Sequence, residues 1–281
     1  MKKIFLAVLV FLLTAGCSIQ SEAQVKEVDA IGITVSDLNR SVDFYTQVLG
    51  FQKVSEYEGW GEESEQLAGQ FGIHFKTARL QLGTEFIELT DYLTSGGRSI
   101  PEDAKSNDLF FQHIAIVVSD MDRAYTRLRS FGVEHVSTAP QTLPVSIPAA
   151  AGIRAFYFHD PDRHNLELIY FPKGKGQDRW QQAKGRLFLG IDHTAIGIRN
   201  TDSSLRFYQA FLGIERKGDS WNQGIEQAHL NFVENASLHI TGLRSSQGPG
   251  IEFLQYINPG PGRPYPADSR VDDIWHWQTI L

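Results

Sequence analysis

The chain is an internal duplication, and its second copy stops before the first copy does. Residues 35–51, VSDLNRSVDFYTQVLGF, return as IRNTDSSLRFYQAFLGI at 198–214. Residues 96–116, GGRSIPEDAKSNDLFFQHIAI, return as PGRPYPADSRVDDIWHWQTIL at 261–281. The copies are offset by 163 to 165 residues. A repeat kept in such close register reproduces a unit of structure and not only a composition.

A shorter unit repeats within each copy. Segments starting at Ala30, His113 and His193 share one order: an apolar run, a polar cap, about ten residues of helical pattern and a glycine. The apolar runs predict buried strands, and the caps accept hydrogen bonds from free N–H groups at a helix start. The caps are Ser36-Asp37, Ser119-Asp120 and Asn200 with Thr201 and Asp202, and the closing glycines are Gly50, Gly132 and Gly213. More strand-like stretches follow each helix. The sequence therefore predicts an α+β fold of β-α-β-β-β modules, three complete and a fourth begun at Asp273.

The N-terminus has the pattern of a secretory signal. Lys2 and Lys3 precede ten apolar residues, 4–13, which are too few to span a bilayer. The sequence LTAGC at 13–17 resembles a bacterial lipoprotein box, which implies lipidation of Cys17, removal of residues 1–16 and a short tether over 17–25. Such a protein is anchored to a membrane of the cell envelope, and Ser18 after the cysteine favours the outer membrane of a Gram-negative cell. An ordinary signal peptide or a cytoplasmic apolar N-terminus is the alternative.

Composition excludes several classes of function. The formal charge is −7 and no basic block occurs, so nucleic-acid binding is not expected. Cys17 is the single cysteine, so the rest of the chain has neither disulfides nor thiolate metal sites. A length of 281 residues suffices for two compact domains. The polar segment 173–187 predicts a linker between a domain at 26–172 and a second at 188–281.

Two patterns together resemble the vicinal oxygen chelate superfamily, which includes glyoxalase I, extradiol dioxygenases and fosfomycin- and bleomycin-resistance proteins. One is the strand, cap and helix phrase that ends in FY and LG, and the other is FYFHDPDRHNLELI at 156–169. Arg163 stands where this family usually has a glycine. The resemblance implies cupped mixed sheets, each built from two modules around one divalent metal ion.

The resemblance also implies metal ligands at the first residue of each opening strand and at a glutamate on the last strand of each module. The matching positions are Ala30, Glu88, His113, Glu167, His193, Glu252 and Gln278. We expect modules to pair within each half, so that Glu88, His113 and Glu167 form the first site and Ala30 leaves one position open. Pairing of the two middle modules would instead unite His113, Glu167, His193 and Glu252. Histidine and carboxylate ligands suit Zn²⁺, Ni²⁺, Mn²⁺ or Fe²⁺.

The expected function is that of a glyoxalase-like, metal-dependent lyase or isomerase acting on a small molecule with adjacent oxygens, with Glu88 or Glu167 moving the proton. The alternatives are an extradiol-type dioxygenase, a metal-free binder of the bleomycin-resistance type and a truncated, inactive relic. The ordinary structural interpretation makes His113 a core histidine and the glutamates solvent-facing residues at the rim of the sheet.

The shorter second copy predicts an exposed sheet. Compared with 117–172, the fourth module lacks about 55 residues in this sequence. Unpaired strand edges and open apolar faces promote association. We therefore expect residues 188–281 to pack on the first half or on another copy of the chain, and to be less stable than 26–172.

Overall fold

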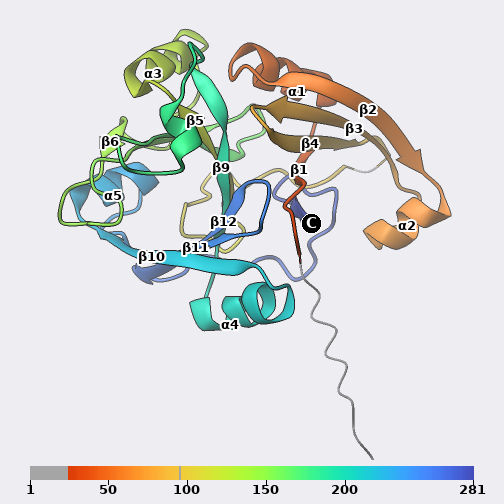
Figure 1. The fold of residues 1–281 in the computed structure, drawn as a ribbon. Helices are drawn as coiled ribbons and strands as arrows, with labels where there is room; N and C mark the ends of the chain where they lie inside the picture. Colours follow the sequence, from red (N-terminus) through yellow and green to blue (C-terminus); the bar gives the residue numbers. More distant parts are fainter. Residues whose placement is uncertain (1–24, 95) are drawn as a thin grey trace, which may run out of the picture.

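The computed structural model describes residues 25–94 and 96–281, which form three β-α-β-β-β modules and one further strand (Figure 1). The first module contains β1 (Ala30–Val35), α1 (Leu38–Gln47), β2 (Gln52–Trp60), α2 (Glu62–Ala68), β3 (His74–Leu82) and β4 (Glu85–Tyr92). The second contains β5 (Gln112–Val118), α3 (Met121–Ser130), β6 (Gln141–Thr142), β7 (Arg154–His159) and β8 (Asn165–Tyr170). After the 3₁₀-helix η1 (Asp178–Gln181), the third contains β9 (Phe188–Gly197), α4 (Thr201–Leu205), the π-helix η2 (Arg206–Phe211), β10 (Glu215–Gln223), α5 (Ile225–Asn231), β11 (Ser237–Arg244) and β12 (Gly250–Asn258). Strand β13 (Trp277–Ile280) begins the fourth.

The helix ends follow the predicted pattern in all three modules. Asp37 accepts a hydrogen bond from the backbone N–H of Arg40, and Asp120 and Asn200 do the same for Arg123 and Ser203. Gly50, Gly132 and Gly213 take φ angles of 76°, 68° and 74°, where a residue without Cβ is favoured. Arg163 takes φ 70° in the hairpin turn between β7 and β8, so it adopts the left-handed conformation of the glycine that it replaces.

The sheets pair modules across the two halves. The eight-stranded sheet has the order β10-β11-β12-β9-β5-β8-β7-β6, and the five-stranded sheet has the order β13-β1-β4-β3-β2. The opening strands β5 and β9 are antiparallel neighbours, as are β1 and β13. The predicted pairing within each half is therefore wrong. The repeat defines each module, but every opening strand offers the same kind of free edge, so the repeat does not decide which two edges meet.

The predicted domain boundaries consequently do not follow the sheets. The eight-stranded sheet joins 112–170 to 188–258 and crosses the boundary that the sequence suggested. The segment 173–187 is not a free linker, because the Trp180 side chain is only 6% exposed and packs against residues of β5, β8 and β9. The second half does pack on the first, as expected. Its lower stability remains a prediction.

The main core is one buried cluster to which both sheets contribute. Ile31 and Ile33 of β1, Ile114 and Ile116 of β5 and Phe253 of β12 belong to one buried cluster, which the helices α1 and α3 also line. Because residues alternate between the two faces of a strand, the opposite face carries the residues at 113, 115, 193 and 195. That concave face, which we call the upper cup, contains the polar residues considered below.

The predicted signal peptide, the lipidation residue Cys17 and most of the tether lie outside the described residues. Within the described part of the chain, every helix is too short or too polar to cross a membrane.

Candidate metal centre

Four side chains of metal-ligand type lie in two staggered rows on four neighbouring strands of the upper cup. His193 and Glu167 both pair in register with Ala115, from β9 and β8. His113 and Glu252 both pair with Ala195, from β5 and β12. Residues paired across neighbouring strands point to the same face of a sheet. The two small alanines leave room between the four longer side chains.

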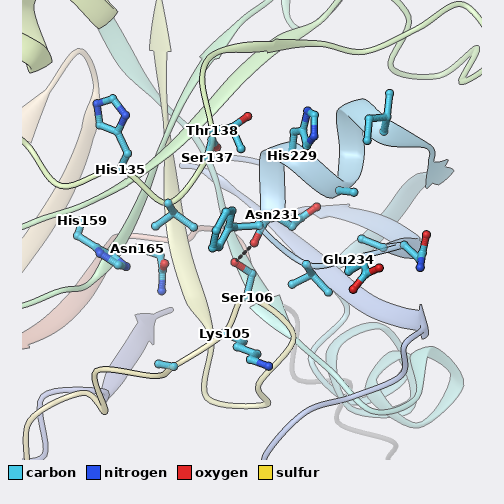
Figure 2. A pocket seen from close by; sticks show the side chains of 18 of the residues that line it. Lys105, Ser106, His135, Ser137, Thr138, His159, Asn165, His229, Asn231 and Glu234 are labelled. Atoms are coloured by element: carbon cyan, nitrogen blue, oxygen red, sulfur yellow. Dashed lines mark hydrogen bonds between the residues drawn. The ribbon is translucent and has the colours of Figure 1, made fainter.

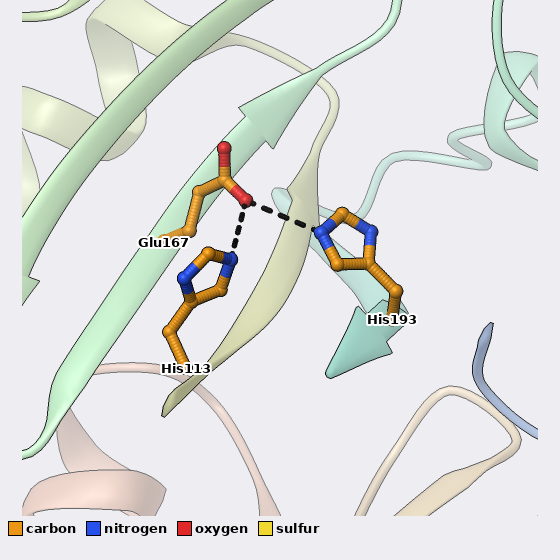
Figure 3. Close-up of side chains that lie close together, drawn as sticks. All are labelled: His113, Glu167 and His193. Carbon is orange, nitrogen blue, oxygen red and sulfur yellow. Dashed lines mark ion pairs between the residues drawn. The ribbon is translucent and has the colours of Figure 1, made fainter. Parts of the chain in front are cut away.

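Three of the four converge closely (Figure 3). One ligand-type atom each from His113, Glu167 and His193 lies within 4.8 Å of the other two. Glu167 Oε2 is 3.1 Å from His113 Nε2 and 3.6 Å from His193 Nε2, and Glu252 Oε2 is 3.5 Å from His193 Nε2. Two ligands on one tetrahedral ion with bonds of ~2.1 Å stand ~3.4 Å apart. The observed separations therefore suit a common divalent ion.

Unused nitrogen atoms support the same assignment. His113 is fully buried, and its Nδ1 has no hydrogen-bond partner among the residues that the structure describes. Its Nε2 lies 3.1 Å from Glu167 Oε2 but outside hydrogen-bond geometry. His193 Nε2 likewise has no hydrogen-bond partner in the described part of the chain. Buried polar atoms without partners are costly, and they are uncommon in native proteins. A metal ion bound by His113 Nε2 and His193 Nε2 would remove that cost for these two atoms.

A β-bulge positions His193. Ala115 pairs with His193 but Ile116 pairs with Ile191, so Asp192 is an extra residue on β9. Bulges redirect side chains and are common beside active sites. Here Asp192 Oδ2 lies 3.1 Å from His193 Nδ1, which leaves Nε2 to face Glu167. Asp192 also accepts hydrogen bonds from Trp180 Nε1 at 2.7 Å and from Arg244 at 2.7 Å, so its orientation is fixed on three sides.

The electrostatics of the cluster follow from burial and from this arrangement. Burial lowers the pKa of His193, but the carboxylates of Glu252, Asp192 and Glu167 outweigh burial and raise that pKa to about 9. Burial raises the pKa of Glu252, with a further contribution from the charge of Glu167. Burial also acts to raise the pKa of Asp192, but hydrogen bonds from His193 and Trp180 and the charge of Arg244 hold it well below its usual range. Three carboxylates thus surround the imidazole of His193, and such a concentration of negative charge favours a bound cation.

Glu88 does not belong to this cluster, which corrects the predicted ligand set. It lies on β4 in the other sheet, and its Oε1 accepts a hydrogen bond from Arg79 Nη1 at 2.8 Å. Arg79 is the residue paired with Glu88 across β3 and β4. At the equivalent place in the third module, Glu252 is paired with Gly242, which has no side chain. Glu252 is therefore available where Glu88 is already ion-paired.

Gln278 and Ala30 occupy the remaining predicted positions in the five-stranded sheet. Gln278 pairs with Gly32, and its amide lies 3.2 Å from His276 Nε2. Ala30 pairs with Ile280 and is fully buried. Neither is near His113. The five-stranded sheet thus has an alanine, a glutamine and an ion-paired glutamate where the upper cup has two histidines and a free glutamate.

A cavity of about 1630 Å³ opens at one end of the upper cup, beside α5 (Figure 2). Asn165 and Asn231 line it. Asn165 pairs in register with His113, so the cavity wall and the cluster share neighbouring strands. Tyr157 pairs with Glu167 across β7 and β8, and the centre of its ring lies 4.8 Å from that of His113. Of the four residues, Glu252 has the most exposed side chain, at 27%.

Comparisons with known proteins agree with this geometry. The sequence profile of the Glyoxalase/Bleomycin resistance protein/Dioxygenase superfamily matches residues 27–168. The chain belongs to this superfamily. A 2-epi-5-epi-valiolone epimerase of an Actinomyces species is 31% identical over 56% of this chain and 85% of its own length. Glyoxalase I of Saccharomyces cerevisiae is 30% identical over 65% of this chain, which spans 55% of the yeast protein.

Solved structures show the same fold. Glyoxalase I of Zea mays matches with a TM-score of 0.55 and 15% identity, over 83% of this chain and 68% of that one. A putative dioxygenase of Bacillus subtilis matches with a TM-score of 0.51 and 16% identity, over 85% of this chain and 68% of that one. At these identities the likeness concerns the fold alone. The two relatives named above are enzymes, and the His-Glu-His cluster is a place where this member of the superfamily could bind a metal ion.

Other charged residues have structural roles. Arg79, Arg98 and Arg263 are all paired with carboxylates. Arg98 binds Asp273 and Arg263 binds Asp108, so each copy of the repeated loop donates an arginine to the aspartate of the other copy. The sequence contains both residues in both copies, but it does not show that they are exchanged. His164 is fully buried and lies against Asp160.

Proposed function

We propose that this chain is a metal-dependent enzyme that moves a proton at a carbon next to a carbonyl, in a small molecule with two adjacent oxygens. His113, Glu167 and His193 would hold the metal ion. The observation that carries the proposal is the convergence of these three buried side chains, in which the Nε2 atoms of His113 and His193 have no hydrogen-bond partner among the described residues. A divalent ion there supplies a Lewis acid that polarises the substrate oxygens.

Glu252 would carry the proton. Its carboxylate lies beside His193, and it is the member of the four that solvent reaches most easily. Gly242, its partner in the sheet, leaves open space beside it, since a Cβ at 242 would meet only the Gly218 carbonyl oxygen at 4.0 Å. The carboxylate takes the proton as the C–H bond breaks and its electron pair shifts toward the carbonyl. The proton then returns to the neighbouring carbon or to the other face of the same carbon.

The named relatives support this class of reaction. An epimerase inverts one stereocentre, and at a carbon next to a carbonyl this requires removal and return of a proton. The reaction needs no oxidant. Glu88, predicted from the sequence to move the proton, is not placed to do so because its carboxylate accepts a hydrogen bond from Arg79. Glu167, the other predicted proton carrier, would instead be a metal ligand.

Proton exchange tests the proposal. The purified protein, loaded in turn with Zn²⁺, Ni²⁺, Mn²⁺ and Fe²⁺, is incubated with a panel of α-hydroxycarbonyl and α-ketoaldehyde compounds in deuterated water. We expect deuterium to enter the α carbon of at least one compound, as followed by NMR. The Glu252→Gln variant should slow this exchange by ~10²-fold or more, within the range for loss of a general base. Exchange that is equal in the wild-type and Glu252→Gln proteins would contradict this role of Glu252.

A dioxygenase is the second candidate. Two histidines and one carboxylate are the ligand set of many non-haem Fe²⁺ oxygenases, and His113, His193 and Glu167 supply it. The expected signature is oxygen uptake by the Fe²⁺-loaded protein with a catechol. If the purified protein retains no metal after incubation with each ion, the result would favour the third alternative, a metal-free binding protein.

We further propose that the mature protein is lipid-anchored in the cell envelope through Cys17. The charged start, apolar run and LTAGC sequence support this. A Cys17→Ser variant is expected to lose incorporation of labelled lipid and to leave the membrane fraction. A variant that remains in the membrane fraction with undiminished label would refute the proposal.

A further inference from the structure

The concave face of the five-stranded sheet holds another cavity, in a different sheet from the metal cluster. Its volume is about 390 Å³, which is within the usual range for small-molecule sites. Strands β1, β3, β4 and β13 form its floor, and α2 lies at its rim. We call it the lower cup. The replacement of metal ligands by Ala30 and Gln278, and the pairing of Glu88 with Arg79, leave this cup without a cation site.

Three aromatic rings form one wall of the lower cup. Tyr57 packs edge-on against Phe75 with 6.3 Å between ring centres, and Phe75 lies 5.7 Å from Tyr92. The floor is less polar than its composition suggests. The hydroxyls of Thr77 and Thr90 bond to each other at 2.9 Å, and the Thr34 hydroxyl donates to the Val271 carbonyl. Such a surface suits a flat, apolar molecule.

The charges of the lower cup disfavour an anion. Arg79 donates to both Asp29 and Glu88, so two carboxylates share one guanidinium. Gln278 and His276 provide one polar edge, and burial lowers the pKa of His276, which keeps that ring neutral at pH 7. A hydrogen-bonding edge beside aromatic walls fits an uncharged molecule that has one polar group.

The two halves of the duplication differ in how their short helices sit. Helix α5 of the third module packs into the upper cup, where Leu230 is 3% exposed and its carbonyl accepts a hydrogen bond from Ser137 of the second module at 2.7 Å. Its counterpart α2 has no buried residue, and Leu67, at the position of Leu230, is 91% exposed at the cavity rim. Figure 1 shows α2 projecting from the end of β2, apart from the other helices.

Helix α2 is bounded by a glycine at each end. Gly61 and Gly69 have positive φ angles, and a Cβ built at either would meet no atom within 4 Å among the described residues. Helix α5 is bounded in the same way by Gly224 and Phe232, both with positive φ. The two helices therefore have the same backbone geometry at their ends, but α5 packs on its sheet and α2 does not.

We propose that the lower cup is a second, metal-free site that binds a flat, uncharged aromatic molecule, and that α2 closes over it so that Leu67 covers the ligand as Leu230 covers the upper cup. Burial of Leu67 against the ligand contributes to affinity. The site does not depend on the metal cluster or on the proposed reaction.

Binding of a neutral fluorescent probe, N-phenyl-1-naphthylamine, to the full chain tests the proposal. Saturable fluorescence enhancement is expected. A Leu67→Asp variant should raise the Kd about tenfold or more, because it puts a charge where an apolar side chain would be buried. Phe71→Asp is the matched control: Phe71 is 93% exposed in the turn after α2 and does not line the cavity, so its Kd should stay within about twofold.

A third variant separates this proposal from the metal site. His113→Ala disables the metal cluster, and it is expected to leave the probe's Kd within about twofold of wild type. Binding that Leu67→Asp leaves unchanged would place the probe elsewhere, for example in the cavity beside α5, and would overturn the proposal. Absence of saturable binding, or equal weakening by Leu67→Asp and Phe71→Asp, would overturn it as well.

Discussion

At one position of the repeat, the residue opposite a glutamate decides what that glutamate can do. Arg79 neutralises Glu88 in the first module, and Gly242 leaves Glu252 free in the third. The sequence contains this difference, but it is visible only once the strand register pairs 79 with 88 and 242 with 252. Both glutamates have the same place in their modules, and the sequence alone does not assign their cross-strand partners.

A Gly242→Arg substitution tests this account. The new side chain has room, and we expect it to pair with Glu252 as Arg79 pairs with Glu88. Proton exchange should then fall by ~10²-fold, as for loss of the general base. The reciprocal variant, Arg79→Gly, should catalyse proton exchange of the substrate at the wild-type rate. An active Gly242→Arg protein that unfolds at the wild-type temperature would show that Glu252 carries no proton.

His164 and Asp160 form a buried, charged pair with two further partners. Its Nδ1 lies 2.8 Å from Asp160 Oδ2 and its Nε2 lies 2.7 Å from the Ile274 carbonyl oxygen. Both neighbours accept, so both ring nitrogens donate and the imidazole is charged. The Tyr45 hydroxyl also donates to Asp160. The network ties the β7–β8 turn to α1 and to the segment before β13.

The network predicts a pH-dependent contribution to stability. Burial lowers the pKa of His164, but the charge of Asp160 and its hydrogen bond outweigh burial, so the folded-state pKa is raised. The stabilisation is therefore complete below the unfolded-state value of about 6.5 and is lost as pH rises through the folded-state value. We expect the difference in Tm between wild type and His164→Gln to be largest below about pH 6.5 and to shrink as pH increases. A difference that is constant with pH would contradict the charged state of His164.

At the scale of elements, the connection between the second and third modules is part of the site. Trp180 in η1 is buried against Ala115, Val117, Ile169 and Leu189, and its indole N–H donates to Asp192. The composition of 173–187 is polar, and the sequence predicted a linker for that reason. A single anchoring tryptophan does not change the average polarity of a segment, so its role depends on the tertiary contacts.

Trp180→Ala is expected to lower the free energy of unfolding by about 3–5 kcal/mol, the usual cost of truncating a buried tryptophan. It also removes one of the donors that hold Asp192. Trp221→Ala is the matched control, because Trp221 is 62% exposed and its loss should cost less than about 1 kcal/mol. Denaturant unfolding followed by circular dichroism gives both values. Equal losses for the two variants would mean that η1 does not anchor the cup.

At the scale of the whole molecule, the sequence predicted the modules but not their partners. Alternating strands, caps and left-handed glycines are local signals, and they placed β1, β5, β9 and β13 correctly. Pairing is a property of whole sheets, in which the free edge of β5 had two similar candidates. The absence of a ligand at Ala30, together with complete ligands at 113, 167, 193 and 252, was the signal that favoured the middle modules.

Cobalt binding tests most directly whether one metal site is built across the two halves. The protein is titrated with Co²⁺ while visible absorption reports ligation, in wild type and in His113→Ala, His193→Ala and Glu88→Gln variants. We predict one Co²⁺ per chain, loss of the absorption in both histidine variants and wild-type binding in Glu88→Gln. Absorption that survives His193→Ala but disappears in Glu88→Gln would contradict the account, because it would place the metal within the first half.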